Sequence, residues 1–232
     1  MNSILTIDRL PDRQIRYNDR DYLFFSGTAY LGMQQLPAFQ QHVADALRQY
    51  GTAFGSSRNG NLRLGIYEQA EAQLAAMLGA PDHQPEMALT LSSGMLAGQV
   101  MVDRLRQQST QLLYAPGAHP ALWDGQATQL PNQSFADWSR QIAEQIRAIQ
   151  TPQPIAILTN SLDAVRSEAY PFDWVHDLPD DRLITLVVDD SHGLGLLNDG
   201  RSIWPQLPRR DNLRVVVTGS LAKAMGLPGA WC

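Results

Sequence analysis

The sequence has one cysteine, Cys232, and no surplus of basic side chains. A single thiol cannot form an internal disulfide, which fits a reducing compartment. The 18 lysines and arginines stand against 23 aspartates and glutamates, for a net charge of −5. The electrostatic attraction that dominates nucleic-acid binding is therefore missing. These two shortages argue against a disulfide-stabilised secreted domain and against a nucleic-acid partner.

Long apolar runs are also missing. The longest, such as 155–158 and 183–188, are far shorter than the ~20 residues that a membrane-spanning helix needs, so we expect buried strands there. Charged residues at 8, 9, 12 and 13 stand where a secretory signal would have its apolar segment. The sequence thus predicts a cytoplasmic protein without membrane association. With 44% hydrophobic residues, it is expected to form a large globular core.

From residue 51 onward, short apolar runs alternate with helical patterns. Strands are expected at 87–91, 112–114, 155–159, 183–188 and 213–218, and helices at 67–78, 95–106 and 135–149. Strands separated by helices imply right-handed crossovers and a mostly parallel sheet with helices on both faces. The expected fold is therefore a three-layer αβα architecture of the α/β class.

The first fifty residues follow a different pattern. A short aromatic strand is expected at 22–25, and apolar residues at three- and four-residue intervals predict a helix over 36–50 that ends at Gly51. A loop rich in glycine and serine follows at 51–60. We therefore expect an N-terminal arm and helix, 1–50, and a large domain, 51–232.

In parallel α/β sheets, ligands bind beyond the carboxyl ends of the strands. After the first expected strand, Ser92-Ser93-Gly94-Met95 opens a helix. The free N–H groups of a helix start can bind an anion, although a plain serine N-cap is the more common meaning of this pattern.

Asp189 follows the strand at 183–188, and a buried carboxylate needs a cation or several hydrogen-bond donors. The partner could be Mg²⁺ in a nucleotidase, but the chain has no G-x-x-x-x-G-K-[ST] loop to hold the triphosphate. It could also be the protonated ring nitrogen of a cofactor.

Lys223 follows the strand at 213–218, in a chain that carries mostly arginine as its cation. Burial of an amine among small and apolar residues lowers its pKa and makes it a nucleophile toward carbonyls; the alternative is a solvated lysine in a loop. An anion cradle, an acid for a pyridinium nitrogen and a Schiff-base lysine are the three contacts that pyridoxal 5′-phosphate (PLP) requires. We therefore expect the three to meet in one site.

Several motifs resemble the PLP-dependent α-oxoamine synthases, of the aminotransferase-like fold type I. They are Tyr30-Leu31-Gly32, Gly55-Ser56-Ser57-Arg58, Ser93-Gly94-Met95, His119, Val188-Asp189-Asp190-Ser191-His192-Gly193 and the run from Ser220 to Gly229. The group includes 8-amino-7-oxononanoate synthase, 2-amino-3-ketobutyrate CoA ligase, 5-aminolevulinate synthase and serine palmitoyltransferase.

The resemblance implies a role for each matching residue. Lys223 would bind the PLP aldehyde as a Schiff base, Asp189 would pair with the pyridine nitrogen, and His119 would stack on the ring; these three would be the catalytic residues. The resemblance also implies that His192 forms a hydrogen bond with the ring 3-oxygen and that the phosphate is bound by the stretch Ser93, Gly94 and Met95 together with Ser220. No metal site is predicted.

The implied reaction condenses an amino acid with an acyl thioester, acyl-CoA or acyl-ACP, usually with decarboxylation, in a homodimer. Four positions depart from the family pattern: Asn160 replaces an acid, Ala164 a serine, Thr28 an asparagine and Tyr67 a histidine. These departures leave open another fold type I enzyme, an aminotransferase or a lyase, and a non-catalytic PLP-binding relative. Family members are longer than this chain, so the large domain is expected to be incomplete at its C-terminus.

Overall fold

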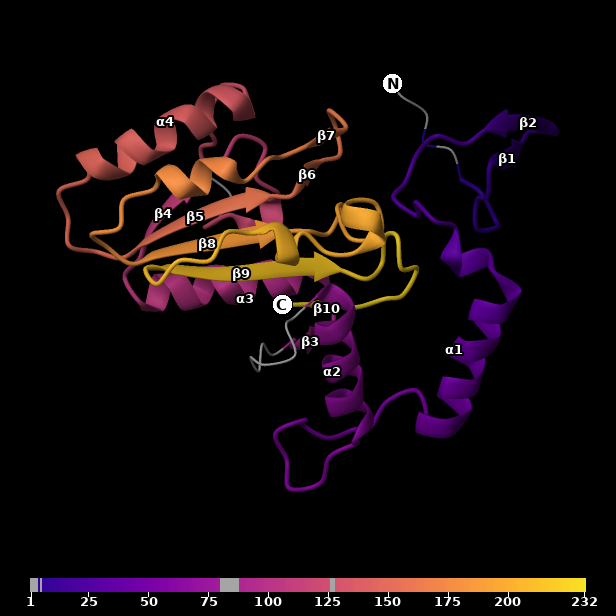
Figure 1. Ribbon diagram of the computed structural model, residues 1–232. Coiled ribbons are helices and arrows are strands. Elements are labelled where there is room, and N and C mark those ends of the chain that lie inside the picture. Colours follow the sequence, from indigo (N-terminus) through magenta and orange to yellow (C-terminus); the bar gives the residue numbers. More distant parts are fainter. Residues whose placement is uncertain (1–3, 5, 80–87, 126–127) are drawn as a thin grey trace.

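A six-stranded sheet forms the centre of the molecule in the computed structural model, which describes residues 4, 6–79, 88–125 and 128–232 (Figure 1). The strand order is β3-β10-β9-β8-β5-β4. Strands β4, β5, β8 and β9 run parallel, while β10 is antiparallel to both β9 and β3. The bounds are β3 Thr90–Leu91, β4 Gln111–Tyr114, β5 Ile155–Asn160, β8 Ile184–Asp189, β9 Leu213–Ser220 and β10 Ala230–Trp231.

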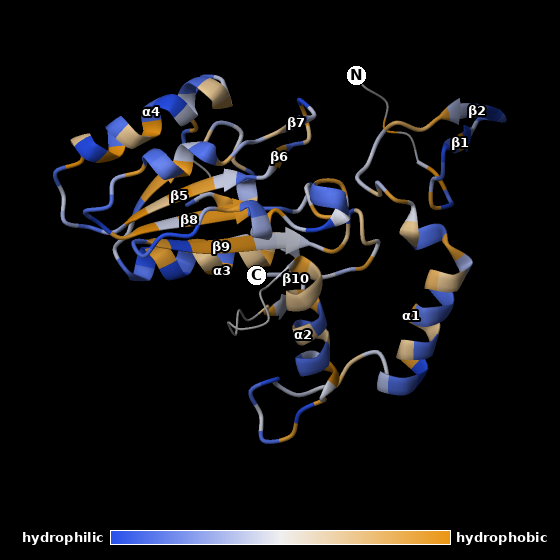
Figure 2. Ribbon diagram, in the orientation of Figure 1, coloured by the Kyte–Doolittle hydropathy of each residue, from blue (hydrophilic) through white to orange (hydrophobic). Residues whose placement is uncertain are grey.

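Both faces of the sheet are covered, as expected for a three-layer fold. Strands β5 and β8 are buried along their whole length, which explains their continuous apolar runs. Ile157 and Leu186 pack on one face in a cluster that includes Trp138 of helix α4 (Phe135–Ala148). Leu158 and Val187 pack on the other face with residues of α3 (Gly94–Gln107). Figure 2 shows the apolar strands between the two helices.

The expected elements of the large domain agree with the structure to within a few residues. Helix α2 spans Ile66–Leu78 and ends at Gly79, which has the left-handed conformation that glycine favours (φ 91°). Of the strand expected at 87–91, only β3 is formed within the described residues, and Met87 lies outside them. Strand β10 was not expected, because two residues are too few to show a periodic pattern.

The N-terminal arm contains a hairpin where a single strand was expected. Strand β1 (Gln14–Tyr17) pairs with β2 (Arg20–Leu23) through Asn18 and Asp19, both with positive φ. A two-residue turn with positive φ at both positions joins antiparallel strands tightly. The second strand therefore begins at Arg20, and it ends at Leu23, before the expected residue 25.

Helix α1 (Pro37–Tyr50) ends at Gly51, as predicted, but none of its residues is buried. It stands apart from the sheet in Figure 1. The division into 1–50 and 51–232 stays a prediction.

Short elements fill the connections. They are the 3-10 helices η1 Met33–Gln35, η2 Pro120–Leu122, η3 Asp173–Asp177, η4 Asn198–Gly200 and η5 Trp204–Gln206, and the hairpin β6 Leu162–Asp163 with β7 Glu168–Ala169. Among the described residues, no helix is both long enough and apolar enough to cross a membrane.

Candidate functional site

Asp189 is the last residue of β8, and its side chain is only 6% exposed. Its Oδ1 accepts a hydrogen bond from the backbone N–H of Ser191 at 2.9 Å. Its Oδ2 lies 3.7 Å from Nδ1 of His119, which is too far for a hydrogen bond. That second oxygen can therefore accept a hydrogen bond from a ligand, which is the position the sequence predicts for a pyridinium nitrogen.

His119 follows β4 and caps the N-terminus of η2, where its Nδ1 accepts the backbone N–H of Ala121 at 3.1 Å. Burial lowers the pKa of His119; the negative charge of Asp189 opposes this shift and the positive charge of Lys223 adds to it. The net effect lowers the pKa of an imidazole whose Nδ1 is already an acceptor, so the ring is neutral at pH 7. The contact with Asp189 is therefore not an ion pair.

Asn160, at the end of β5, holds the turn that carries His119. Its Oδ1 accepts the backbone N–H of His119 at 3.0 Å, and its Nδ2 donates to the carbonyl of Gly117 at 2.7 Å. The side chain is buried, and both polar ends of the carboxamide are satisfied by the same turn. The sequence marked Asn160 only as a departure from the family pattern; the structure shows what the amide does.

His192 lies in the turn after β8, where its Nδ1 is 2.7 Å from the hydroxyl oxygen of Tyr30. Burial lowers the pKa of His192 to about 4, and the positive charge of Lys223 contributes to this shift. The imidazole is thus neutral at pH 7. Sequence reasoning assigned no role to Tyr30 itself, although the match of Tyr30-Leu31-Gly32 to the family was a signal for it.

Lys223 lies three residues after the end of β9 and is partly buried. Burial lowers its pKa, and the nearby negative charge of Asp189 opposes this shift. The same positive charge acts on His119 and on His192. The structure therefore brings these four groups, from the ends of β4, β8 and β9, into mutual electrostatic range.

The N-terminus of α3 lies beside the end of β9. A Cβ added at Gly94 would lie 3.1 Å from Cβ of Ser220 and 3.4 Å from Oγ of Ser191. The Oγ of Ser191 in turn accepts the backbone N–H of Ser220 at 2.9 Å. Glycine at 94 therefore allows the start of the helix to approach both the end of β9 and the turn after β8 closely.

Ser93 is the N-cap of α3, because its Oγ accepts the N–H of Leu96 at 3.2 Å. This bond shows that the ordinary N-cap interpretation applies to its hydroxyl. The N–H groups of Gly94 and Met95 belong to the first helical turn, which has no intrahelical acceptors for them. These two groups remain suited to an anion, together with the positive end of the helix dipole.

The other departures lie in different surroundings. Ala164 is in the exposed turn between β6 and β7. The ring of Tyr67 faces the guanidinium of Arg58, 5.3 Å from the ring centroid. Thr28 precedes Tyr30 in a tight turn and accepts its N–H through the backbone carbonyl at 2.9 Å. Of the four, only Asn160 is seen to hold a predicted site residue in place.

The donor set fits PLP on chemical grounds. A lysine with a lowered pKa can attack an aldehyde, a buried carboxylate with an available oxygen can pair with a pyridinium nitrogen, and two free N–H groups at a helix start can bind a phosphate. The close approach of Gly94 to Ser220 and Ser191 places these N–H groups beside the end of β9, the strand that precedes Lys223.

Solved structures with similar folds include a serine palmitoyltransferase of Sphingomonas wittichii, with a TM-score of 0.78 and 17% identity over 98% of this chain and 56% of that chain. Another, described as SPT with a PLP internal aldimine, has a TM-score of 0.77 and 15% identity over 97% of this chain and 56% of its own. At these identities, the likeness establishes the fold.

The sequence is 32% identical over 233 residues to 8-amino-7-oxononanoate synthase of Serratia marcescens, covering 94% of this chain and 55% of that protein. The chain thus spans about half the length of the curated relatives that it matches. The family model for aminotransferase class I and II matches residues 20–232. With nine-tenths of its length inside that match, the chain belongs to the aminotransferase class I and II family.

Proposed function

We propose that the chain belongs to a PLP-dependent acyltransferase that condenses an amino acid with an acyl thioester, as the α-oxoamine synthases do. The observation that carries this proposal is the meeting of His119, Asp189, His192 and Lys223 at the carboxyl edge of the sheet. A cytoplasmic location and a homodimeric state stay predictions from the sequence.

Each side chain has a defined task in this proposal. PLP would supply an electron-withdrawing ring that stabilises negative charge on the amino-acid α-carbon. Lys223 would bind the aldehyde carbon through Nζ and later move a proton at that α-carbon. Oδ2 of Asp189 would keep the ring nitrogen protonated. His119 would cover one face of the ring as a neutral imidazole, and the N–H groups of Gly94 and Met95 would hold the phosphate.

Lys223 makes the proposal easy to test, because it is the only lysine in the 232-residue sequence. Purified protein mixed with PLP should gain a visible absorption band, and borohydride reduction should leave the cofactor on the peptide that contains Lys223. Lys223→Arg keeps the positive charge but cannot form the Schiff base, so it should abolish both signals.

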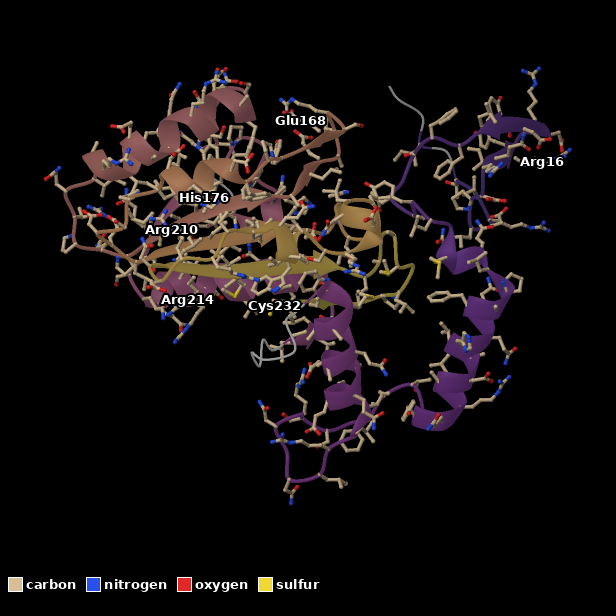
Figure 3. All side chains as sticks on the ribbon, viewed as in Figure 1. Arg16, Glu168, His176, Arg210, Arg214 and Cys232 are labelled. Atoms are coloured by element: carbon tan, nitrogen blue, oxygen red, sulfur yellow. The ribbon has the colours of Figure 1, made fainter. Side chains whose placement is uncertain are left out.

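A second variant tests whether position matters as well as chemistry. Arg214→Lys, combined with Lys223→Ala, moves the amine to an exposed residue near the beginning of β9, far along the strand from its carboxyl end (Figure 3). This double variant should not recover the band. Labelling at residue 214 equal to that of the original Lys223 would contradict the proposal.

Two alternatives are separated by products and spectra. An aminotransferase or a lyase would produce a keto acid without releasing CoA, whereas an acyltransferase would release CoA from an acyl-CoA donor. A non-catalytic PLP-binding relative, suggested by the changes at Asn160, Ala164 and Thr28, would show the PLP band but no spectral change with any amino acid.

A further inference from the structure

Tyr30 joins the N-terminal arm to the candidate site. Its hydroxyl contacts Nδ1 of His192 across 162 positions of sequence. The residues after Tyr30 approach two loops of the site. A Cβ added at Gly195, in the loop after His192, would be 3.5 Å from Leu31, and a Cβ added at Gly226, in the loop after Lys223, would be 2.9 Å from the backbone nitrogen of Gln34. The stretch 30–35 therefore packs on the loop that carries His192 and on the loop that carries Lys223.

The protonation states of the two partners restrict the hydrogen bond between them. Burial raises the pKa of Tyr30, so the phenol keeps its proton at neutral pH. His192 is a neutral imidazole, which has one N–H donor and one bare acceptor nitrogen. If the phenol donates to Nδ1, the imidazole hydrogen must be on Nε2.

The reverse arrangement serves the proposed site less well. An N–H at Nδ1 would occupy the phenol oxygen and leave Nε2 as a bare acceptor. The 3-oxygen of PLP is itself an acceptor, so two lone pairs would then face each other. The site needs a donor from His192, and only the Nε2–H tautomer provides one on the side away from Tyr30.

We propose that Tyr30 is a positioning residue that holds His192 as the Nε2–H tautomer, ready to donate to an oxygen of the ligand. This inference rests on the proposed function for the identity of that oxygen, but the tautomer itself is a property of the protein alone. Tyr30 acts through His192 and does not itself touch the reacting atoms.

Burial is the main reason that His192 is neutral, and the charged groups around it act in both directions. The positive charge of Lys223 opposes protonation, as does His119 whenever it is charged, while Asp189 and Asp163 favour it. The phenol adds directional control, since it contacts one ring nitrogen only. Burial, helped by the charge of Lys223, thus keeps the ring neutral, and Tyr30 determines which nitrogen carries the hydrogen.

The direct test uses protein without PLP and ¹⁵N NMR of its histidine side chains at pH 7. Nδ1 of His192 should have the shift of a bare acceptor and Nε2 that of an N–H. Tyr30→Phe removes only the hydroxyl and should convert His192 to a mixture of both tautomers. Tyr22→Phe, an exposed tyrosine of the same arm, is the matched control and should change nothing.

A hydrogen on Nδ1 in the original protein would overturn the proposal, as would an unchanged tautomer in Tyr30→Phe. Loss of folding in that variant would be recognised by comparing its far-UV circular dichroism with that of Tyr22→Phe. In that event Tyr30→Trp, whose indole N–H is also a donor, is measured in place of Tyr30→Phe. If His192 stays the Nε2–H tautomer in this variant, the result supports a donor at position 30. A mixture of both tautomers overturns the proposal.

A second measurement uses the PLP-loaded protein and follows the pH at which its visible absorption changes. A ligand oxygen that loses a hydrogen-bond donor holds the neighbouring proton more tightly. The pH midpoint of the absorption change should therefore rise in Tyr30→Phe, by about one pH unit or less, which is the size expected for one weakened hydrogen bond. In a His192→Ala background, Tyr30→Phe should leave this midpoint unchanged. Absence of any PLP band would defeat the proposed function while leaving the NMR result intact, and an unshifted midpoint would defeat the role of Tyr30 toward the ligand.

Discussion

Asn160 occupies a position where a carboxylate and a carboxamide act differently. One end of its side chain accepts from His119 and the other donates to Gly117, so a single buried residue closes the turn at both sides. An ionised acid could accept from His119 but would place a second acceptor against the carbonyl of Gly117. The change from an acid to Asn160 is therefore consistent with a role in orienting His119.

Asn160→Asp tests this interpretation. At pH 7 the variant should lose about 1–3 kcal/mol of unfolding free energy, because a buried acceptor then faces the Gly117 carbonyl without a donor. Urea denaturation measures the loss. Asn59→Asp, in the exposed loop, is the control and should stay within about 0.5 kcal/mol of the original protein. Equal stability of the two variants would show that the amide is not needed.

At the scale of elements, close backbone approaches decide how α3 meets the site. A Cβ at Gly98 would lie 2.8 Å from the carbonyl carbon of Ala121 in η2. Gln99, the next residue, donates to the carbonyls of Ala121 and Trp123 at 2.9 Å and 3.0 Å. Helix α3 and the segment after His119 are thus packed in direct contact.

Gly98→Ala should therefore destabilise the protein, although alanine normally favours a helix interior by about 1 kcal/mol over glycine. The methyl group would force α3 away from η2, at a cost of about 1–3 kcal/mol. Gly65→Ala is the matched control, since its Cβ would meet nothing closer than 4.0 Å. Thermal unfolding should separate the two, and an equal or higher midpoint for Gly98→Ala would contradict the packing described.

The glycine-rich loop is tied to the sheet by a second element contact. Arg58 donates to both carboxylate oxygens of Glu71 in α2, at 2.8 Å and 2.9 Å, and Glu71 also accepts the N–H and hydroxyl of Thr90 in β3. Burial opposes ionisation of Glu71, but the hydrogen bonds from Thr90 and Arg58 outweigh it and lower its pKa.

Glu71→Gln should cost about 1–3 kcal/mol of unfolding free energy, because Arg58 would lose a charged acceptor and one oxygen would become a competing donor. Glu144→Gln removes a carboxylate that also pairs with an arginine, Arg147, but is 76% exposed. That variant should change stability by less than about 1 kcal/mol. Equal effects in guanidinium denaturation would mean that the Arg58 contact contributes no more than a surface ion pair.

For the whole molecule, buried Asp190 and half-buried His192 give the stability opposite pH dependences in the same window. Burial raises the pKa of Asp190 to about 6, so the folded state holds this proton more tightly, and unfolding free energy falls as pH rises from about 4 to about 6. The lowered pKa of His192, about 4, means that the unfolded state binds the proton more readily, so stability rises over that window.

Removing either group should therefore reveal the other. His192→Gln should leave a stability that falls between pH 4 and 6, by at most about 3 kcal/mol from the shift of Asp190. Asp190→Asn should leave a stability that rises over the same range. Denaturant unfolding of the PLP-free protein at several pH values measures how the unfolding free energy of each variant changes with pH. If both variants keep the pH dependence of the original protein, the opposite contributions of Asp190 and His192 are contradicted.

The local sequence pattern determined the helices, the buried strands and the positions where strands end, because periodicity and turn residues act over short distances. It also placed Asp189, His192 and Lys223 just after those strands, which is why much of the candidate site could be predicted. The exposure of α1 could not be predicted from the sequence, because the spacing of its apolar residues is the same whether or not another part of the structure covers the helix.

Only the tertiary structure decided which groups contact each other across the chain. The bond from Tyr30 to His192 joins residues 162 positions apart, and that from Asn160 to His119 joins residues 41 apart. Strand β10 runs antiparallel because the chain after Lys223 turns back between β9 and β3. These contacts depend on how sheet and loops pack, and no short stretch of sequence contains both partners of such a bond.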